Sequence, residues 1–364
     1  MPMCVVIDGV PIRGMSLGIV VEHLLEGWCE LSPDDEIHLV IGPDAELVLP
    51  ASVQVHRVKI GRPQVLNRLY VQNVTVPRLC RELDADAMLG VIPATTISPL
   101  PCPRTMIAFD LRHELRPEQF TRKARLLRKV SYEVGYRQAD GIACISERTR
   151  NDLFASHPWL RSHLVRVALL GADHVKGWSP MSSSEEYAIA FGQWGNKNVD
   201  LVLDAWTYLH LRGEALPLVL VGLSEASRVR VQAKVDRLGL GQVVTILPWL
   251  PTDAFRQRFA SARLVVFPSD FEGFGLPAVE AMRLGIPVVI SDDPALLEVT
   301  TGHATVMDGS GPEALARAVE VARRVSLEDL AKAKSHAEEF TWKRTAAQVR
   351  ELLELCMAGR DHQP

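Results

Sequence analysis

The chain lacks the usual marks of a secreted, membrane-spanning or nucleic-acid-binding protein. None of its six cysteines belongs to a C-x-x-C pair and most lie in apolar runs, which indicates packed thiols in a reducing, cytoplasmic setting. Its first residues, MPMCVVIDGV, lack the basic start of a signal peptide. No apolar run approaches the ~20 residues of a spanning helix. The formal net charge of -4 gives no general attraction to nucleic acid, and none is expected as a partner.

The remaining composition is that of an ordinary globular protein. Hydrophobic residues make up 47% and charged residues 23% of the 364 residues. Because domains usually hold roughly 100–200 residues, two domains are expected, each large enough to bury its own core.

Short apolar runs alternate with longer amphipathic ones throughout the first half of the chain. Strands are expected at 5–7, 38–41, 53–58, 87–91, 105–108, 141–145 and 164–170. Helices are expected at 17–31, 74–83, 120–139 and 147–155, with Ser146 as the N-cap of the last. This alternation predicts a parallel sheet covered on both faces.

The Ser-rich stretch 177–186, GWSPMSSSEE, reads as a linker, after which the alternation restarts. Strands are expected at 187–191, 218–221, 243–247, 264–267 and 287–290, and helices at 199–211, 224–238, 252–261, 277–284 and 312–324. The predicted fold class is therefore α/β, with two doubly wound units. Ligands of such sheets bind beyond the carboxyl ends of the strands.

One stretch, VVFPSDFEGFGLPAVEAM at 265–282, carries most of the chemistry. A buried strand ends there, and Gly273 and Gly275 let the backbone approach a ligand before a helix that begins near Pro277. The start of that helix favours a phosphate. Because Glu272 and Glu280 bracket the loop, the segment suits a ligand with hydroxyls at both ends and phosphates between them.

This segment resembles the E-x7-E signature of family 4 of the retaining glycosyltransferases, which have the GT-B fold. Other segments resemble that family in the right order: 140–153 (DGIACISERTRNDL), 165–173 (VRVALLGAD), 291–298 (SDDPALLE) and 340–346 (FTWKRTA). The resemblance covers nearly the whole chain.

The resemblance implies two Rossmann-like domains that face each other across a cleft. An acceptor-binding domain is expected at 1–175, a nucleotide-sugar-binding domain at 176–340, and a last helix at 341–364 that returns to the first domain. The activity implied is retaining transfer of a hexose or deoxyhexose from a nucleoside-diphosphate sugar to a glycan, lipid-linked or small-molecule acceptor. No cofactor is expected, because the nucleotide-sugar is a substrate.

The resemblance also implies roles for individual residues. Glu272 would contact hydroxyls of the donor sugar, Glu280 the ribose diol, and Lys197 the diphosphate. Backbone N–H groups would hold the sugar and the distal phosphate; they belong to Gly273, Phe274, Gly275 and Leu276. Gln193 stands where many relatives carry an arginine, so the positive charge at the diphosphate rests on Lys197.

Two further segments are expected to reach the site from the first domain. The loop 13–18 precedes a helix, and Gly18 is expected to approach the donor. Asp110, Arg112 and His113 are expected to line the cleft, although Phe109 replaces the histidine that many relatives have there.

No metal site is expected. The pair Asp84 and Asp86 forms a D-x-D sequence at the predicted end of a helix, where acids commonly cap or turn the chain. Asp292 and Asp293 follow a strand and are interpreted as part of a loop near the cleft.

A basic run at 122–129 suggests a peripheral contact with the inner face of a membrane, while a solvated face over a core stripe is the other interpretation. Two other functions stay open. One is a non-catalytic relative that binds a nucleotide-sugar, and the other is a different enzyme on the same fold, such as a sugar-nucleotide epimerase.

Overall fold

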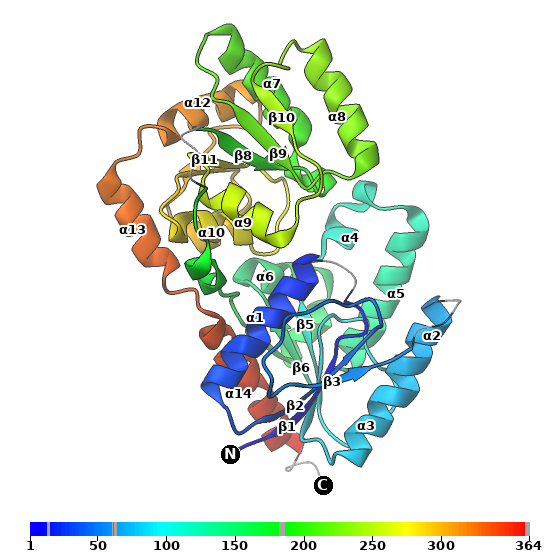
Figure 1. The fold of residues 1–364 in the computed structure, drawn as a ribbon. Coiled ribbons are helices and arrows are strands. Elements are labelled where there is room, and N and C mark those ends of the chain that lie inside the picture. Colours follow the sequence, from blue (N-terminus) through cyan, green and yellow to red (C-terminus); the bar gives the residue numbers. More distant parts are fainter. Residues whose placement is uncertain (13–14, 60, 62–63, 182–185, 361–364) are drawn as a thin grey trace. The chain divides into compact units, whose positions relative to one another are not determined.

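The computed structural model describes residues 1–12, 15–59, 61, 64–181 and 186–360. The chain divides into two compact units, of which unit 1 comprises 1–171 with 341–364, and unit 2 comprises 172–340 (Figure 1). The first boundary expected from the sequence, after residue 175, lies a few residues beyond this division.

Unit 1 is built on a parallel sheet of seven strands in the order β3-β2-β1-β4-β5-β6-β7. The strands are β1 (Cys4–Asp8), β2 (Glu36–Ile41), β3 (Gln54–Arg57), β4 (Ala87–Gly90), β5 (Arg104–Ala108), β6 (Gly141–Cys144) and β7 (Leu164–Val167). All seven strands expected in this half are present; the apolar runs of the central strands β1, β4, β5 and β6 are almost fully buried, whereas the edge strand β3 is mostly exposed.

The helices of unit 1 cover this sheet. They are α1 (Met15–Leu31), α2 (Gln64–Tyr70), α3 (Val76–Glu82), α4 (Arg112–Leu115), α5 (Arg122–Gln138), α6 (Glu147–Ser156) and α14 (Trp342–Arg360), with a π-helical turn, Val71–Thr75, between α2 and α3. Ser146 caps α6 as expected, since its side chain accepts a hydrogen bond from the Thr149 N–H at 3.0 Å.

The last helix returns to the first half of the chain. Helix α14 packs against α1, and a Cβ on Gly27 of α1 would collide with the Trp342 backbone (Figure 1). Arg350 of α14 forms an ion pair with Asp35, at 2.8 Å between Nε and Oδ2, and Asp35 also accepts from the Trp28 indole N–H at 2.9 Å. The resemblance predicted this return.

Unit 2 is built on a parallel sheet of six strands in the order β10-β9-β8-β11-β12-β13. The strands are β8 (Ala188–Phe191), β9 (Leu218–Val221), β10 (Val244–Ile246), β11 (Leu264–Phe267), β12 (Val288–Ile290) and β13 (Thr305–Val306). The helices are α7 (Val199–Leu211), α8 (Glu225–Arg237), α9 (Thr252–Ala260), α10 (Leu276–Arg283), α11 (Pro294–Thr300), α12 (Pro312–Ala322) and α13 (Leu327–Ala337).

The D-x-D pair forms the turn between α3 and β4. Asp84 takes a left-handed backbone conformation, with φ of 50°. The Asp86 carboxylate accepts a hydrogen bond from the Cys4 N–H at 2.7 Å. This is the structural role expected for acids at the end of a helix.

No helix in the described part of the chain is both long enough and apolar enough to cross a lipid bilayer.

Candidate functional site

Two loops meet at the carboxyl ends of the adjacent strands β8 and β11. Asn196, which is buried in the short helical turn Gly195–Lys197, joins them. Its side-chain Nδ2 donates to the Phe271 carbonyl at 2.8 Å and to the Glu272 carboxylate at 3.1 Å, while its backbone carbonyl accepts from the Asp270 N–H at 3.0 Å. A buried asparagine thus fixes one loop on the other. Asn196 was not predicted as a site residue from the sequence, although it lies in the same loop as Lys197.

The loops bring Lys197 and Glu272 into direct contact. The Lys197 Nζ atom lies 2.6 Å from Glu272 Oε1, and the two side chains are 12% and 13% exposed. The ammonium group also lies 4.2 Å from the centre of the Phe267 ring. Lys197 and Glu272, which were both predicted as site residues, lie 75 positions apart in the sequence. In the structure they form one partly buried pair of opposite charges.

The loop ends at Gly275, where α10 begins. Gly275 has φ of 96°, and a Cβ at this position would collide with the Leu296 side chain, so glycine is required both for the backbone angle and for the space. The first N–H groups of a helix have no acceptor within the helix and carry its positive dipole end. The start of α10, at Leu276, can therefore receive an anion.

Phe274 faces the interior of unit 2. Its ring is buried and packs edge-on against Phe340, with 5.9 Å between ring centres. Only the backbone of Phe274 is therefore available to a ligand, as the resemblance implies. The packing of this ring anchors the loop that holds Gly273 and Gly275.

Glu280 lies on the second turn of α10 and is buried. Its Oε1 atom lies 3.0 Å from Nε2 of His174, a residue of the short helix Asp173–Gly177. His174 was not predicted from the sequence, because it lies one residue beyond the segment 165–173 that resembles the family.

Asp293 holds both the loop and the next helix. Its Oδ1 caps α11 by accepting from the Ala295 N–H at 2.9 Å, and its Oδ2 accepts from the Glu272 N–H at 3.3 Å. The neighbouring hydroxyl of Ser291 donates to the Ser269 carbonyl. Of the two acids that follow β12, Asp293 therefore holds the backbone of Glu272 in place.

Gln193 lies in the same loop as Lys197, just after β8, and is exposed. It adjoins the carboxyl end of β9, since a Cβ on Gly222 would lie 3.5 Å from the Gln193 Cβ. The structure thus leaves Gln193 accessible at the same edge of the sheet as the Lys197–Glu272 pair.

In unit 1, the carboxyl end of β1 carries the buried residue Asp8. Its carboxylate accepts from the Thr95 hydroxyl at 2.6 Å, from the Gln72 amide at 2.7 Å and from the Val10 N–H at 3.2 Å. Burial raises the pKa of Asp8, while these hydrogen bonds oppose the rise. The network fixes the turn that follows β1.

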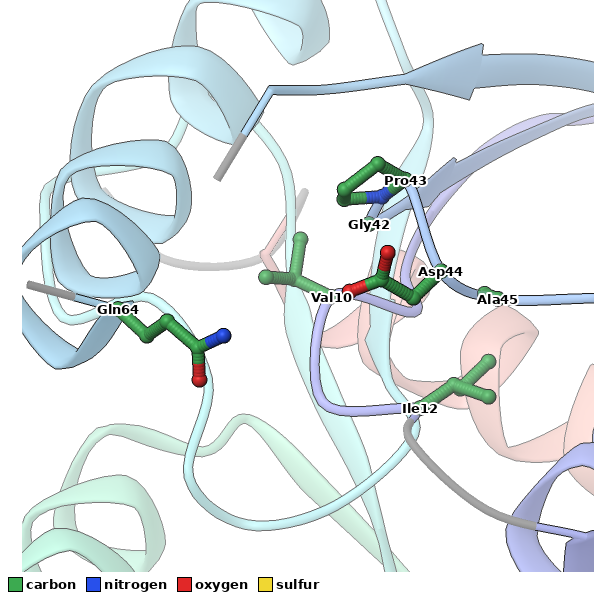
Figure 2. Close-up of a pocket in the computed structure, with 7 residues that line it drawn as sticks. All are labelled: Val10, Ile12, Gly42, Pro43, Asp44, Ala45 and Gln64. Carbon is green, nitrogen blue, oxygen red and sulfur yellow. The ribbon is translucent and has the colours of Figure 1, made fainter. Parts of the chain in front are cut away.

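This turn borders a hollow of about 200 Å³ at the carboxyl ends of β1 and β2. Figure 2 shows Asp44, from the segment after β2, and Gln64, from α2, as its polar side chains. The lining residues are Val10, Ile12, Gly42, Pro43, Asp44, Ala45 and Gln64. A carboxylate and an amide beside apolar walls suit a ligand that carries hydroxyl groups.

The expectation for Gly18 was wrong in its local structure. The helix begins at Met15, so Gly18 lies inside α1 instead of in the loop before it. Gly18 is buried, and a Cβ there would lie 3.2 Å from Leu47, which gives the glycine a packing role. Arg13 and Gly14 of the expected loop lie outside the described residues.

Asp110 and His113, expected together, differ in their local structure: Asp110 precedes the short helix α4, and His113 belongs to that helix. Asp110 is half-buried and accepts from the Arg112 N–H at 2.9 Å. His113 is 0% exposed and lies edge-on to Tyr132, with 4.9 Å between ring centres. The His113 ring therefore packs inside unit 1 and lines no accessible surface of that unit, whereas Asp110 stays within reach of solvent.

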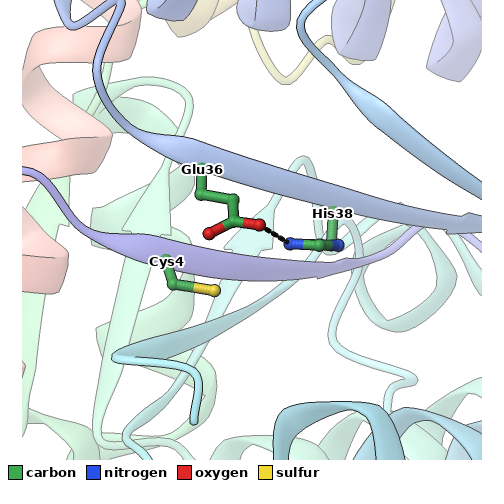
Figure 3. A group of neighbouring side chains, drawn as sticks. All are labelled: Cys4, Glu36 and His38. Carbon is green, nitrogen blue, oxygen red and sulfur yellow. Dashed lines mark hydrogen bonds and ion pairs between the residues drawn. The ribbon is translucent and has the colours of Figure 1, made fainter. Parts of the chain in front are cut away.

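A second polar cluster, at the amino ends of β1 and β2, has side chains that could ligate a metal. Figure 3 shows Cys4, Glu36 and His38, whose candidate ligand atoms all lie within 4.8 Å of one another. His38 uses both ring nitrogens, at 3.0 Å from Glu36 and 2.9 Å from His56. Burial raises the pKa of the Cys4 thiol to about 11, so this sulfur is protonated at neutral pH. The cluster is internally hydrogen-bonded and lies at the strand ends opposite those where parallel sheets bind ligands.

Comparison with known proteins extends these observations. Residues 182–340 match the family model described as glycosyl transferases group 1. The chain is 30% identical over 157 residues to an O-antigen chain mannosyltransferase B of Escherichia coli (42% of this chain, 41% of the relative). It is 37% identical over 136 residues to a D-inositol 3-phosphate glycosyltransferase of Paenarthrobacter aurescens (35% and 33%). The matches thus span only about a third to two fifths of these curated relatives.

Solved structures resemble the chain over almost its whole length. A sucrose-phosphate synthase from Thermosynechococcus elongatus superposes with a TM-score of 0.77 at 16% identity, covering 98% of this chain and 100% of that one. Anabaena Alr3699/HepE in complex with UDP and glucose gives a TM-score of 0.74 at 16% identity, covering 97% and 99%. At this identity the likeness concerns the fold alone. Residues 182–340 are therefore similar to the glycosyl transferases group 1, and the fold of the chain is GT-B.

Proposed function

We propose that the protein is a retaining glycosyltransferase that uses a nucleoside-diphosphate sugar and requires no metal. The observation that carries this proposal is the pairing of Lys197 with Glu272 beside the start of α10. A cation, a carboxylate and a helix N-terminus within one loop cluster match a ligand with both phosphates and sugar hydroxyls.

The roles follow from the order of the groups along the cluster. Glu272 accepts hydrogen bonds from hydroxyls of the donor sugar, and the N–H groups between Gly273 and Leu276 hold the sugar and the distal phosphate. Lys197 binds the diphosphate. Glu280, on the second turn of α10, binds the ribose diol. The Lys197–Glu272 contact places the group that binds the diphosphate directly beside the group that binds the sugar.

The reaction breaks the bond between the anomeric carbon of the sugar and the diphosphate oxygen. The acceptor hydroxyl attacks from the same face, its proton passes to the leaving diphosphate, and the configuration is retained. Lys197 and the first turn of α10 stabilise the negative charge that develops on the leaving group. Gln193 carries no charge and can add only a hydrogen bond.

The acceptor is expected in unit 1. The hollow beside Asp44 and Gln64 offers hydrogen-bonding groups to a sugar or another polyol, and Asp110 remains accessible. The matching proteins include an O-antigen chain mannosyltransferase and a phosphatidylinositol dimannoside mannosyltransferase. We expect a glycan, lipid-linked or small-molecule acceptor of this hydroxylated type.

A donor screen tests the proposal. The full chain is incubated with several nucleotide-sugars, including GDP-mannose, named in a Mycobacterium tuberculosis relative, and UDP-glucose, bound in a structure of Anabaena Alr3699/HepE. We expect one donor to raise the melting temperature and to be hydrolysed slowly, with release of the alpha sugar from an alpha-linked donor. Nuclear magnetic resonance distinguishes the anomer before it equilibrates.

Glu272→Ala should reduce hydrolysis and transfer at least a hundredfold while the fold persists, because the contacts of this carboxylate with the sugar are lost. Glu328→Gln, an exposed acid on α13, is the matched control and should retain full activity. Full activity of Glu272→Ala would refute the site. Donor binding without any turnover would instead support a non-catalytic relative, and release of the beta sugar would exclude retention.

A further inference from the structure

The first turns of α5 carry their apolar side chains on the outside. Leu126, Leu127 and Val130 are 64%, 56% and 55% exposed, and no residue between 121 and 130 is buried. At 3.6 residues per turn these three share one face, and the buried Tyr136 lies on the roughly opposite face. An ordinary surface helix turns its apolar face to the core, so α5 has the reverse orientation here.

The same turns concentrate positive charge. Five basic residues occupy them: Arg122, Lys123, Arg125, Arg128 and Lys129. The segment 119–132 contains no acid, in a chain whose net charge is -4. Among the described residues, none of these five forms an ion pair with an acid, and the Arg128 guanidinium lies 5.0 Å from the centre of the Phe120 ring. The charge is thus local and open to an external anion.

Helix α2 adds a second exposed apolar stripe to the same unit. Its exposed apolar residues are Val65, Leu66, Leu69 and Tyr70, and the segment 64–81 again contains no acid. Both helices reach one loop: Arg68 of α2 donates to the Ala94 carbonyl at 3.4 Å, and Gly135 of α5 packs against the Pro93 carbonyl. Helices α2 and α5 are therefore neighbours within unit 1 (Figure 1).

We propose that this α2/α5 surface binds the surface of an anionic lipid bilayer. An exposed apolar face bordered by lysine and arginine is the arrangement with which interfacial helices enter the boundary between headgroups and acyl chains. The basic side chains then contact the lipid phosphates. Nucleic acid fits less well, since the residues between the basic ones are aliphatic and offer no stacking surface. The proposal goes beyond sugar transfer and does not depend on it.

Vesicle co-sedimentation of the full chain tests this surface. We expect binding to phosphatidylcholine vesicles that contain phosphatidylglycerol, little binding to phosphatidylcholine alone, and release at high salt. Leu126→Gln with Leu127→Gln should weaken binding tenfold or more, because the inserting side chains are lost. Arg122→Gln, Lys123→Gln and Arg125→Gln should each weaken it about fivefold.

Because the substituted side chains are exposed, the melting temperature and the donor-induced thermal shift should not change. The matched control is Leu211→Gln with Leu327→Gln in unit 2, where the leucines are 81% and 86% exposed, and it should bind vesicles like the wild type. Absence of wild-type binding to anionic vesicles would overturn the proposal, as would equal binding by the Leu126/Leu127 variant. Self-association that this variant abolishes, without vesicle binding, would assign the surface to a second copy of the chain instead.

Discussion

The carboxylate of Glu280 accepts a hydrogen bond from the imidazole of His174, with 3.0 Å between Oε1 and Nε2, and both side chains are almost fully excluded from solvent. A buried carboxylate on a helix can take several orientations, and a fixed donor selects one of them. His174 is itself held by packing edge-on to Trp178, with 5.6 Å between ring centres. Under the proposed function, His174 is a positioning residue that aims Glu280 at the ribose.

Removing the His174 donor should therefore reduce the preference for ribose over 2′-deoxyribose. We expect His174→Phe to lower the ratio of affinities for a nucleoside diphosphate and its 2′-deoxy analogue about five- to tenfold, the usual contribution of one hydrogen bond. Calorimetric titration of both ligands measures this ratio.

His174→Gln keeps a side-chain N–H donor and should restore part of the preference. Glu280→Gln should lower the ratio in the wild type but have little further effect in His174→Phe, because the two residues act together. A wild-type ratio near one would show that Glu280 does not bind the ribose. An unchanged ratio in His174→Phe would show only that His174 does not position Glu280.

The Lys197 ammonium should be responsible for much of the diphosphate affinity. We expect Lys197→Ala to weaken binding of a nucleoside diphosphate about ten- to hundredfold but to leave binding of the nucleoside nearly unchanged, since the nucleoside has no phosphate. Lys332→Ala, an exposed lysine of α13, is the control and should match the wild type. Equal affinities of wild type and Lys197→Ala would place the diphosphate elsewhere.

Much of the architecture could be predicted because the apolar runs are local signals. The strands that end at Phe191 and Phe267 were predicted at their observed ends, and parallel pairing of neighbouring strands then brings their loops together. The Lys197–Glu272 pair follows from this topology. Helix α13 gave no comparable signal, because its buried side chains are the small residues Ala333 and Ala337.

Other features depend on contacts between distant segments. Asn196 and His174 acquire their roles only through partners 75 and 106 residues away, which no local pattern reveals. His113 was expected at an accessible surface, but packing against Tyr132 directs its ring into unit 1. Gly18 was placed in a loop, although the helix begins before it. A single histidine or glycine does not specify which way the surrounding chain turns.

Gly275 should tolerate no side chain. Gly275→Ala places a Cβ at φ of 96° and against Leu296, so we expect a loss of about 2–4 kcal/mol in the free energy of unfolding and a larger loss of donor binding. Gly285→Ala is a control for the backbone angle alone, because its φ is 71° and a Cβ there meets nothing within 4 Å. It should cost only about 1 kcal/mol. Denaturant unfolding of the two variants separates the cost of the backbone angle from the cost of the clash with Leu296. Equal losses of unfolding free energy would show that the Leu296 side chain moves aside at little cost.

The ion pair between Asp35 and Arg350 should make the attachment of α14 sensitive to acid. Burial favours the protonated form of Asp35, but hydrogen bonds from Arg350 and Trp28 outweigh it and lower the pKa of this carboxyl. A carboxyl whose pKa is lowered by folding stabilises the folded state above its ordinary pKa, and the stabilisation disappears as the pH falls through the lowered value.

Asp35→Asn should thus lower the free energy of unfolding by about 1–3 kcal/mol at neutral pH and flatten its decline in acid. Asp34→Asn, which changes a neighbouring exposed acid, is the control. Urea unfolding between neutral pH and the acid range measures both effects, and a decline in Asp35→Asn as steep as in the wild type would assign the acid sensitivity to other carboxyls.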